Sequence, residues 1–309
     1  MTLQQLEYVI ALSKHKNFEK AAEICFVTQP TLSMQLKKLE EEIGFLIFDR
    51  TKKPLQQTPF GTVFIDKATV ILEEVSELKA IVNHDIFAVE GEYRLGIIPT
   101  LAPYILPLLL PEIAAKHPKT NLIIYELQSE DIIERLKVRS LDIAILATPL
   151  EEKSLDENII FYEPFYGYFP DGHSQLNNKF IDINDLDLNE LLVLEEGHCF
   201  RNQTLRICQV KDKYSAKNIS YQSGSIETIK RLIEKGMGFS LIPALSKEIG
   251  TNPKLLRAFS APIPAREVSL VSHRNFHKTG IKATIKRIIL ENLPPEFETG
   301  NNIRMIKWR

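Results

Sequence analysis

The stretch that decides the fold of the N-terminal third reads Phe18-Glu19-Lys20-Ala21-Ala22-Glu23-Ile24-Cys25-Phe26-Val27-Thr28-Gln29-Pro30-Thr31-Leu32-Ser33. It predicts a short helix with two small alanines, a tight turn, and a second helix capped by Thr28, whose first turn tolerates Pro30. The second helix runs to about Glu42, presents leucines on one face and polar residues on the other, and ends at Gly44. This pattern is typical of a helix-turn-helix, with a plain three-helix bundle as the alternative.

The flanking segments extend this unit to residues 1–58. Thr2 is a suitable N-cap for a first helix, and Asp49 to Pro54 form a basic hairpin that we interpret as a wing. Residues 1–60 hold 8 Lys/Arg and 7 Asp/Glu, so any DNA contact relies on local patches rather than on net charge. The candidate DNA-contacting residues are Gln29, Pro30, Thr31, Ser33, Lys37, Arg50, Lys52 and Lys53.

Residues 59–90 predict one long linker helix. Its apolar side chains alternate at spacings of four and three, which is a heptad seam: Phe64, Ala68, Ile71, Val75, Leu78 and Val82. Because a lone helix would leave this seam in water, we expect it to pair with a second copy, chiefly through Phe64, Ile71, Val75 and Leu78. Two recognition helices in a dimer would then read two DNA half-sites.

Residues 91–309 alternate between strand and helix patterns. The strand segments include Leu191–Leu194 and Ile219–Gln222, and the alternation predicts parallel sheets covered by helices on both faces. Two similar halves suggest subdomains around a cleft, the first at about 91–162 and 267–300 and the second at about 163–266. Thr100 and Ser129 each follow a strand at a helix start, where they either face the cleft or simply cap a helix.

Composition describes an ordinary globular chain of 309 residues with net charge -2. Three cysteines do not make a disulfide framework, and the N-terminus lacks a signal peptide, so we expect a cytoplasmic protein. The uncharged stretch from Leu95 to Leu110 contains three prolines and is too short for a membrane span.

Cys199 and Cys208 are the residues with the most distinctive chemistry. His198 and Arg201 flank the first thiol, and such groups favour a thiolate. Across a helix the two Cα atoms would stand about 13 Å apart, whereas a disulfide needs about 7 Å or less, so joining them requires unwinding. Inert cysteines are the alternative, the spacing is not a metal signature, and Cys25 is expected to pack in a core.

The N-terminal motifs resemble those of LysR-type transcriptional regulators. The resemblance rests on residues 18–33, on Leu36-Lys37-Lys38-Leu39-Glu40, on Gly44 to Arg50 and on Thr58-Pro59-Phe60-Gly61. It implies a winged helix-turn-helix DNA-binding domain, a long linker helix and an α/β effector domain of two Rossmann-like (periplasmic-binding-protein-like) subdomains. It also implies double-stranded DNA with a dyad operator, assembly into dimers and tetramers, contact with RNA polymerase, and no cofactor.

Within that family the chain is similar to the hydrogen-peroxide sensors. The similar segments are Gly96-Ile97-Ile98-Pro99-Thr100, Glu195 to Arg201, Cys208 and Ile242-Pro243-Ala244-Leu245. The resemblance implies that Cys199 is peroxidatic, that Cys208 is resolving, and that a glutaredoxin- or thioredoxin-type reductant resets the pair. It places Thr100, Ser129, His198, Arg201, Asn202 and Arg266 around the peroxide. Ser129 stands where the family usually has threonine, which keeps the hydroxyl. Asn202 stands where an aspartate is common, and this change puts the rate of disulfide formation in question.

Two other classes of function stay open on the sequence. One is a LysR-type regulator whose cleft binds a small organic effector, with the cysteines incidental. The other is a thiol peroxidase that turns over with a dithiol reductant, against which the DNA-binding motif and the linker seam argue.

Overall fold

The structure is a computed structural model that describes residues 1–52, 54–82, 87–210, 224–248, 250–294, 297 and 302–309. Its chain divides into two compact units, Met1–Ile86 and Phe87–Arg309. None of the helices within these described ranges is long and apolar enough to cross a membrane.

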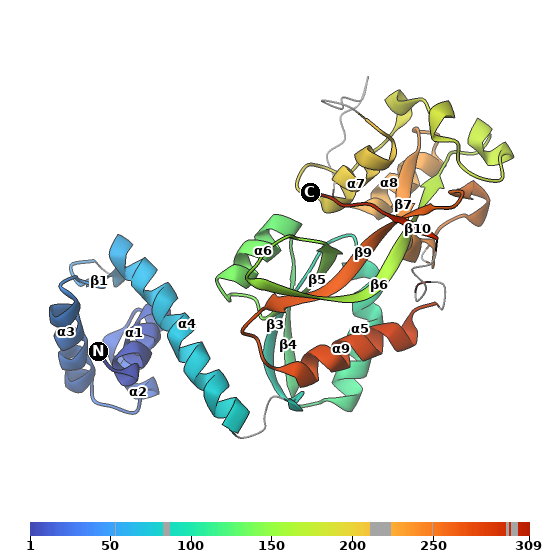
Figure 1. The fold of residues 1–309 in the computed structure, drawn as a ribbon. Coiled ribbons are helices and arrows are strands. Elements are labelled where there is room, and N and C mark those ends of the chain that lie inside the picture. Colours follow the sequence, from blue (N-terminus) through green and yellow to red (C-terminus); the bar gives the residue numbers. More distant parts are fainter. Residues whose placement is uncertain (53, 83–86, 211–223, 249, 295–296, 298–301) are drawn as a thin grey trace. The chain divides into compact units, whose positions relative to one another are not determined.

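The first unit is a winged helix-turn-helix followed by a long helix (Figure 1). Its elements are α1 (Leu3–His15), α2 (Phe18–Ile24), α3 (Gln29–Ile43), β1 (Phe48–Asp49), β2 (Gln56–Gln57) and α4 (Pro59–Val82). The predicted caps are confirmed: Thr2 closes a capping box, Thr28 accepts from the Thr31 N–H, and Gly44 takes the left-handed conformation at φ 77°. Antiparallel pairing of β1 with β2 forms the wing.

Apolar packing explains why these short helices are stable. Ala21, Ala22, Leu32, Leu36 and Leu39 are all buried in one core, and Cys25 packs against its edge as predicted. Small side chains on α2 let it lie close to α3, so the spacing of alanines and leucines sets the helix-turn-helix geometry.

The predicted extent of the linker helix is wrong at its C-terminal end. We expected a helix to Glu90, but the described part of α4 ends at Val82, and residues 88–90 are not helical. Val89 instead packs against the core of the second unit, and its carbonyl accepts a hydrogen bond from Thr120 Oγ1 at 2.9 Å. Docking of this segment on a sheet therefore overrides the helical pattern.

The second unit is built on a mixed sheet in the order β4-β3-β5-β9-β6-β7, with β10 on β9 and β8 on β6. Its strands are β3 (Gly91–Ile97), β4 (Thr120–Glu126), β5 (Ile143–Thr148), β6 (Leu155–Tyr168), β7 (Ser240–Pro243), β8 (Leu256–Ala258), β9 (Ile263–His273) and β10 (Ile303–Met305). Parallel pairing holds for β3 with β4 and β5, but β9 runs antiparallel to β5 and β6, and β7 is antiparallel to β6. The prediction of purely parallel sheets is therefore wrong, because β9 brings the chain back beside β5 in the opposite sense.

Five helices of the second unit carry the remaining pattern: α5 (Ala102–Lys116), α6 (Ser129–Lys137), α7 (Cys199–Ile207), α8 (Ile226–Glu234) and α9 (Thr279–Asn292). Helix α7 spans the cysteine segment, and the other four lie between strands, as the alternating pattern predicts. The predicted strand Leu191–Leu194 is wrong, since only an isolated bridge joins Leu191 to Phe239. Leu191, Val193 and Leu194 are buried like residues of a strand, but apart from that bridge the segment has no regular secondary structure. The predicted strand Ile219–Gln222 lies outside the described residues.

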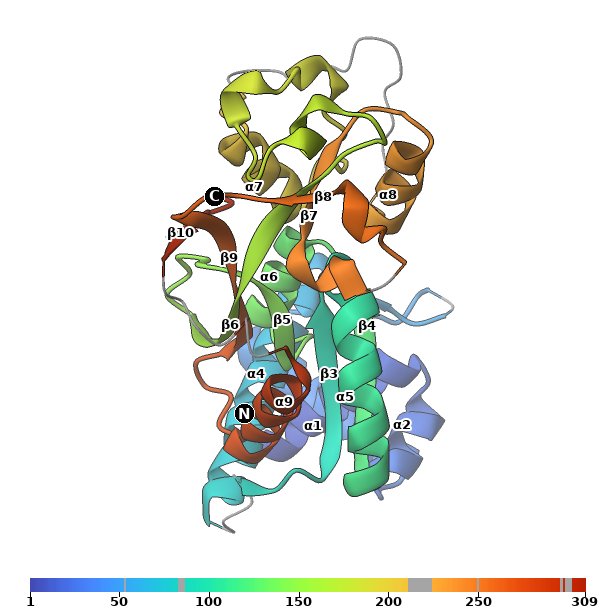
Figure 2. The same ribbon diagram turned by 90° about the vertical axis from the view of Figure 1, so that its right-hand side faces the viewer.

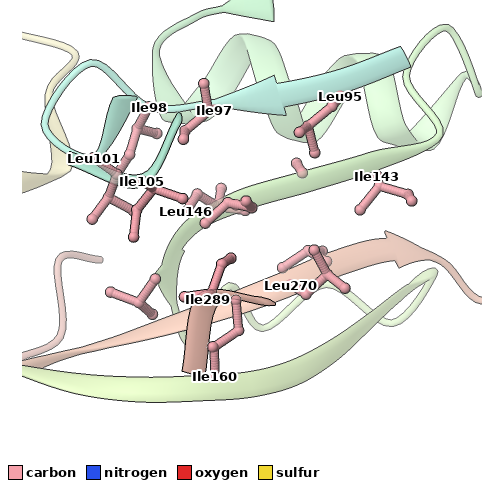
Figure 3. Close-up of a cluster of buried hydrophobic side chains, with 14 of the residues drawn as sticks. Leu95, Ile97, Ile98, Leu101, Ile105, Ile143, Leu146, Ile160, Leu270 and Ile289 are labelled. Carbon is pink, nitrogen blue, oxygen red and sulfur yellow. The ribbon is translucent and has the colours of Figure 1, made fainter. Parts of the chain in front are cut away.

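Two hydrophobic cores divide the second unit. The first surrounds β3, β5, α5 and α9. Figure 3 shows part of it and labels ten of its side chains, among them Leu95, Leu146 and Leu270. The second gathers around β7, α7 and α8. Strand β6 (Figure 2) contributes to both: Phe161 belongs to the first core and Phe165 to the second. The subdomain boundaries expected from the sequence stay a prediction.

Candidate functional site

Helix α7 carries one cysteine at each end. Cys199 is its first residue, and Cys208 caps its C-terminus; both are free thiols and only 2% exposed. The two thiols belong to different cores, Cys199 to the first and Cys208 to the second. At about 1.5 Å of rise per residue, roughly 13 Å of helix separates their backbones. A bond between them therefore requires one cysteine to leave its core.

The chain before Cys199 has a geometry that only glycine supplies. Gly197 lies at φ 93°, and a Cβ there would stand 2.1 Å from Gln128 Oε1. This close approach packs the start of α7 against the loop that leads into α6. The helix consequently begins at a fixed point beside Ser129, the first residue of α6.

The surroundings of Cys199 act on the pKa of its thiol in opposite directions. Burial raises the pKa of its thiol, while the Arg266 guanidinium, a hydrogen bond from the Ser129 hydroxyl and the backbone N–H groups of Phe200 and Cys199 itself lower that pKa. The two N–H groups belong to the start of α7, where unpaired donors favour an anion. Burial outweighs these groups, so the reduced site holds mainly a thiol, and the neighbouring groups stabilise the small fraction that is thiolate.

The cation that acts on Cys199 is not one of its neighbours in sequence. Arg201 donates to the Leu194 carbonyl at 2.8 Å, and His198 Nε2 stands 3.5 Å from Glu195 Oε1. The expectation that His198 and Arg201 supply the activating charge is therefore not what the geometry favours. Arg266, which the resemblance also implied, is the basic residue that lowers the pKa of this thiol.

Arg266 is held in place by a fully buried network. Its Nε and Nη2 each lie 2.7 Å from Glu163 Oε2, and its Nη1 donates to Thr100 Oγ1 at 2.8 Å. Both charged side chains are 0% exposed, and Glu163 Oε1 accepts from the Leu245 N–H at 2.8 Å. The guanidinium also lies over the Phe200 ring at 5.2 Å. These hydrogen bonds and contacts hold the Arg266 guanidinium at one position.

Glu163 is a site residue that the sequence analysis missed. It lies directly opposite Arg266 in the register of β6 with β9. The available signal was a lone carboxylate within the apolar run Phe161-Tyr162-Glu163-Pro164-Phe165. A charge in a buried strand needs a partner, but the sequence does not tell which strand supplies it.

Ser129 has a buried hydroxyl that is free for a further contact. The residue is 1% exposed, and apart from the Cys199 thiol its Oγ has no hydrogen-bond partner among the described residues. Buried polar atoms are usually paired, so an unpaired hydroxyl beside a thiol suits a small polar ligand. The structure thus brings together Thr100, Ser129, Cys199 and Arg266, four of the residues expected at the site.

Two other predicted residues lie apart from this cluster. His198 lines an open cleft of about 470 Å³, together with Tyr104, Gln128, Glu195 and Glu227. Asn202 is on the exposed side of α7, where its Nδ2 donates to the Trp308 carbonyl at 3.2 Å.

Among the described residues, no charged side chain acts on the thiol of Cys208. Burial alone raises the pKa of its thiol to about 12. In the conformation described, Cys208 is therefore a protonated and unreactive thiol.

The predicted DNA-contacting residues fall on α3 and the wing. Gln29, Pro30, Lys37 and Lys52 are exposed and Thr31 and Ser33 half-buried, whereas Lys53 lies outside the described residues. Arg50 is fixed by the buried Glu40 carboxylate at 2.9 Å, which also accepts the Ile47 N–H. The Glu40 carboxylate thus links the end of α3 to the wing.

The linker seam is only partly covered by its own unit. Ala68 is buried and Phe64 packs against the first unit's core, but Ile71 is 39% and Leu78 64% exposed. Val75 is half-buried. The far half of the seam leaves apolar area open to water.

Comparisons with known proteins agree with these features. Residues 3–62 match the bacterial regulatory helix-turn-helix protein, lysR family, and residues 88–289 match the LysR substrate binding domain. The hydrogen peroxide-inducible genes activator of Haemophilus influenzae is 34% identical over 274 residues, which are 88% of this chain and 90% of that protein.

Solved structures of OxyR proteins are also similar to this chain. The full-length OxyR of Pseudomonas aeruginosa, as a cysteine-to-aspartate variant, is 32% identical with a TM-score of 0.75, covering 94% of each chain. A hydrogen-peroxide-bound cysteine-to-serine OxyR variant from Corynebacterium glutamicum is 25% identical with a TM-score of 0.61, covering 94% of this chain and 92% of that one. The chain therefore belongs to the LysR family of bacterial helix-turn-helix regulators.

Proposed function

We propose that this protein is a peroxide-sensing transcriptional regulator in which Cys199 is the sensing thiol. The observation that carries the proposal is the pairing of a buried thiol with a fixed cation, Arg266, and an otherwise unpaired hydroxyl, Ser129. The relatives named for hydrogen peroxide support the same chemistry.

The first step uses the thiolate form of Cys199. Its sulfur attacks one oxygen of H2O2, the O–O bond breaks, and the departing hydroxide takes up a proton to leave as water. Sulfur is oxidised to a sulfenic acid and the peroxide is reduced. Arg266 stabilises the thiolate, and the Ser129 and Thr100 hydroxyls are placed to hold the peroxide in line.

The second step joins the two ends of α7. The Cys208 sulfur attacks the sulfenic sulfur, forms the Cys199–Cys208 disulfide and releases water. Because the thiols occupy separate cores, the bond changes the packing of α7. The covalent bond thus biases a two-state element of the regulatory domain.

The output is a change in DNA binding by a cytoplasmic dimer or tetramer. The exposed apolar part of the α4 seam supports pairing of two copies, which would set two α3 helices on a dyad operator. We propose that oxidation alters this spacing and so the recruitment of RNA polymerase. The thiol reacts once per signal, and a glutaredoxin- or thioredoxin-type dithiol restores it.

A second candidate is a regulator whose cleft takes a small organic effector. The cleft of about 470 Å³ beside His198, with Tyr104 and three carboxylates on its walls, favours this alternative. A cationic molecule would suit such a lining.

Inducibility in cells separates the two candidates. Target genes are identified by DNA occupancy, and their transcripts are measured after hydrogen peroxide in cells carrying wild type, Cys199→Ser or the control Cys25→Ser. Peroxide sensing predicts loss of induction for Cys199→Ser alone. Induction that survives Cys199→Ser would favour the organic effector.

A further inference from the structure

The C-terminal segment Ile303–Arg309 crosses α7. Strand β10 pairs in parallel with the start of β9, and the Ile306 N–H continues the pairing to the Ala265 carbonyl at 2.9 Å. Both ribbon views place the C-terminus beside α7 (Figures 1 and 2). The end of the chain is thus anchored next to Arg266.

Three side chains of α7 bind three successive carbonyls of this segment. Gln203 Nε2 donates to Ile306 at 2.8 Å, Arg206 Nη1 donates to Lys307 at 3.0 Å, and Asn202 Nδ2 donates to Trp308 at 3.2 Å. Gln203 is fully buried, so its hydrogen bond is shielded from water. All three donors lie between Cys199 and Cys208 in the sequence.

Trp308 anchors the segment to the other core. Its side chain is 4% exposed within the first core, and its Nε1–H donates to the Ala147 carbonyl at 3.1 Å. Ile306 is buried in the second core. The segment therefore spans the same two cores that hold the two cysteines.

We propose that residues 306–308 act as a strap that holds α7 helical, with Asn202, Gln203 and Arg206 as positioning residues that slow closure of the disulfide. This inference rests on the proposed function. Bringing Cys208 to the Cys199 sulfenic acid unwinds α7, and unwinding separates these donors from the strap. The strap is expected to oppose the second step, since its hydrogen bonds go to Asn202, Gln203 and Arg206 rather than to Cys199.

Asn202→Asp tests the strap with a minimal change. A carboxylate has no N–H to donate and faces the Trp308 carbonyl, so one hydrogen bond is lost. We expect disulfide closure about fivefold faster than in wild type, and about tenfold or more faster when the chain stops after Met305. Lys307→Gln is the matched control: it removes the exposed Glu151 ion pair but no α7 contact, and closure is expected unchanged.

The readout follows both steps separately. Rapid quenching with alkylation gives the disulfide rate, and a dione probe in a Cys208→Ser background gives the sulfenic-acid rate, which the strap variants leave unchanged. Trp308 is the only tryptophan in the chain. Its emission is expected to shift to longer wavelength at the rate of disulfide closure and to stay constant in Cys208→Ser.

The possible outcomes are distinct. Equal or slower closure in both Asn202→Asp and the truncated chain, with wild-type disulfide still forming, would overturn the strap and leave the proposed function standing. If Trp308 emission stayed constant through full oxidation, the strap would likewise be overturned while the proposed function stood. Failure of wild type to form the disulfide would overturn both proposals.

Discussion

The two ends of α7 place the same thiol in opposite surroundings. At Cys199 burial is opposed by Arg266, Ser129 and the helix N–H groups, whereas at Cys208 no described residue opposes burial, which raises the pKa to about 12. The pKa of both thiols is raised, but only the first has neighbours that stabilise its thiolate. The difference gives the reaction an order: peroxide chemistry occurs in a fixed site, and the conformational change is required by the second step.

The largest expected effect comes from removing each sulfur in turn. Cys199→Ser is expected to abolish reaction with stoichiometric peroxide. Cys208→Ser keeps the first step but stops at the sulfenic acid, which a dione probe and intact mass detect. If both variants lost the reaction with peroxide equally, Cys208 would also take part in the first step, and the two thiols would not differ in role.

Replacing the cation addresses the Cys199 side of the comparison. Arg266→Gln leaves Glu163 as an unpaired buried carboxylate, so we expect about 3 kcal/mol lower free energy of unfolding and a peroxide rate lower on the order of tenfold. The Arg266→Gln/Glu163→Gln double variant is the control. It is expected to regain most of the stability, measured by urea unfolding, but none of the rate.

The pH dependence sharpens the same contrast. Since burial raises the pKa of Cys199 above its ordinary value, the peroxide rate is expected to rise about tenfold per pH unit through neutrality without a plateau. For Cys208 the folded pKa of about 12 lies above that of the unfolded chain. Its contribution to stability is therefore complete below about pH 8.5 and is lost as the pH rises towards 12.

That loss is measurable by comparing wild type with Cys208→Ala. Wild type should lose unfolding free energy faster than the variant between about pH 9 and 11. Parallel pH profiles for the two proteins would contradict the burial of a protonated Cys208.

The smallest effect is expected at Ser129. Ser129→Ala removes one hydrogen bond to the thiolate and is expected to slow the peroxide reaction about fivefold in stopped-flow measurements. Ser129→Thr keeps the hydroxyl and serves as the control. A rate for the alanine variant equal to wild type would show that the hydroxyl takes no part.

Local signals explain what the sequence predicts well. The caps Thr2 and Thr28, the stop at Gly44 and the leucine face of α3 act within one or two turns, so the helix-turn-helix follows from neighbours. These features need no knowledge of distant contacts.

Long-range partners explain what the sequence does not predict. Glu163 meets Arg266 across 103 positions, and Gln203 meets Ile306 across the same separation. Such pairs depend on the antiparallel return of β9, which the alternating pattern did not predict. His198 and Arg201 were predicted to favour the Cys199 thiolate because they are its neighbours in sequence. Arg266 is its neighbour only in space, and a sequence does not show that proximity.

The most direct test of the account maps thiols after substoichiometric hydrogen peroxide is added to the reduced protein under argon. Alkylation and mass spectrometry then report each cysteine. A selective Cys199–Cys208 disulfide is expected, with Cys25 still alkylated. Two free thiols at 199 and 208, or slow oxidation scattered over all three cysteines, would contradict it.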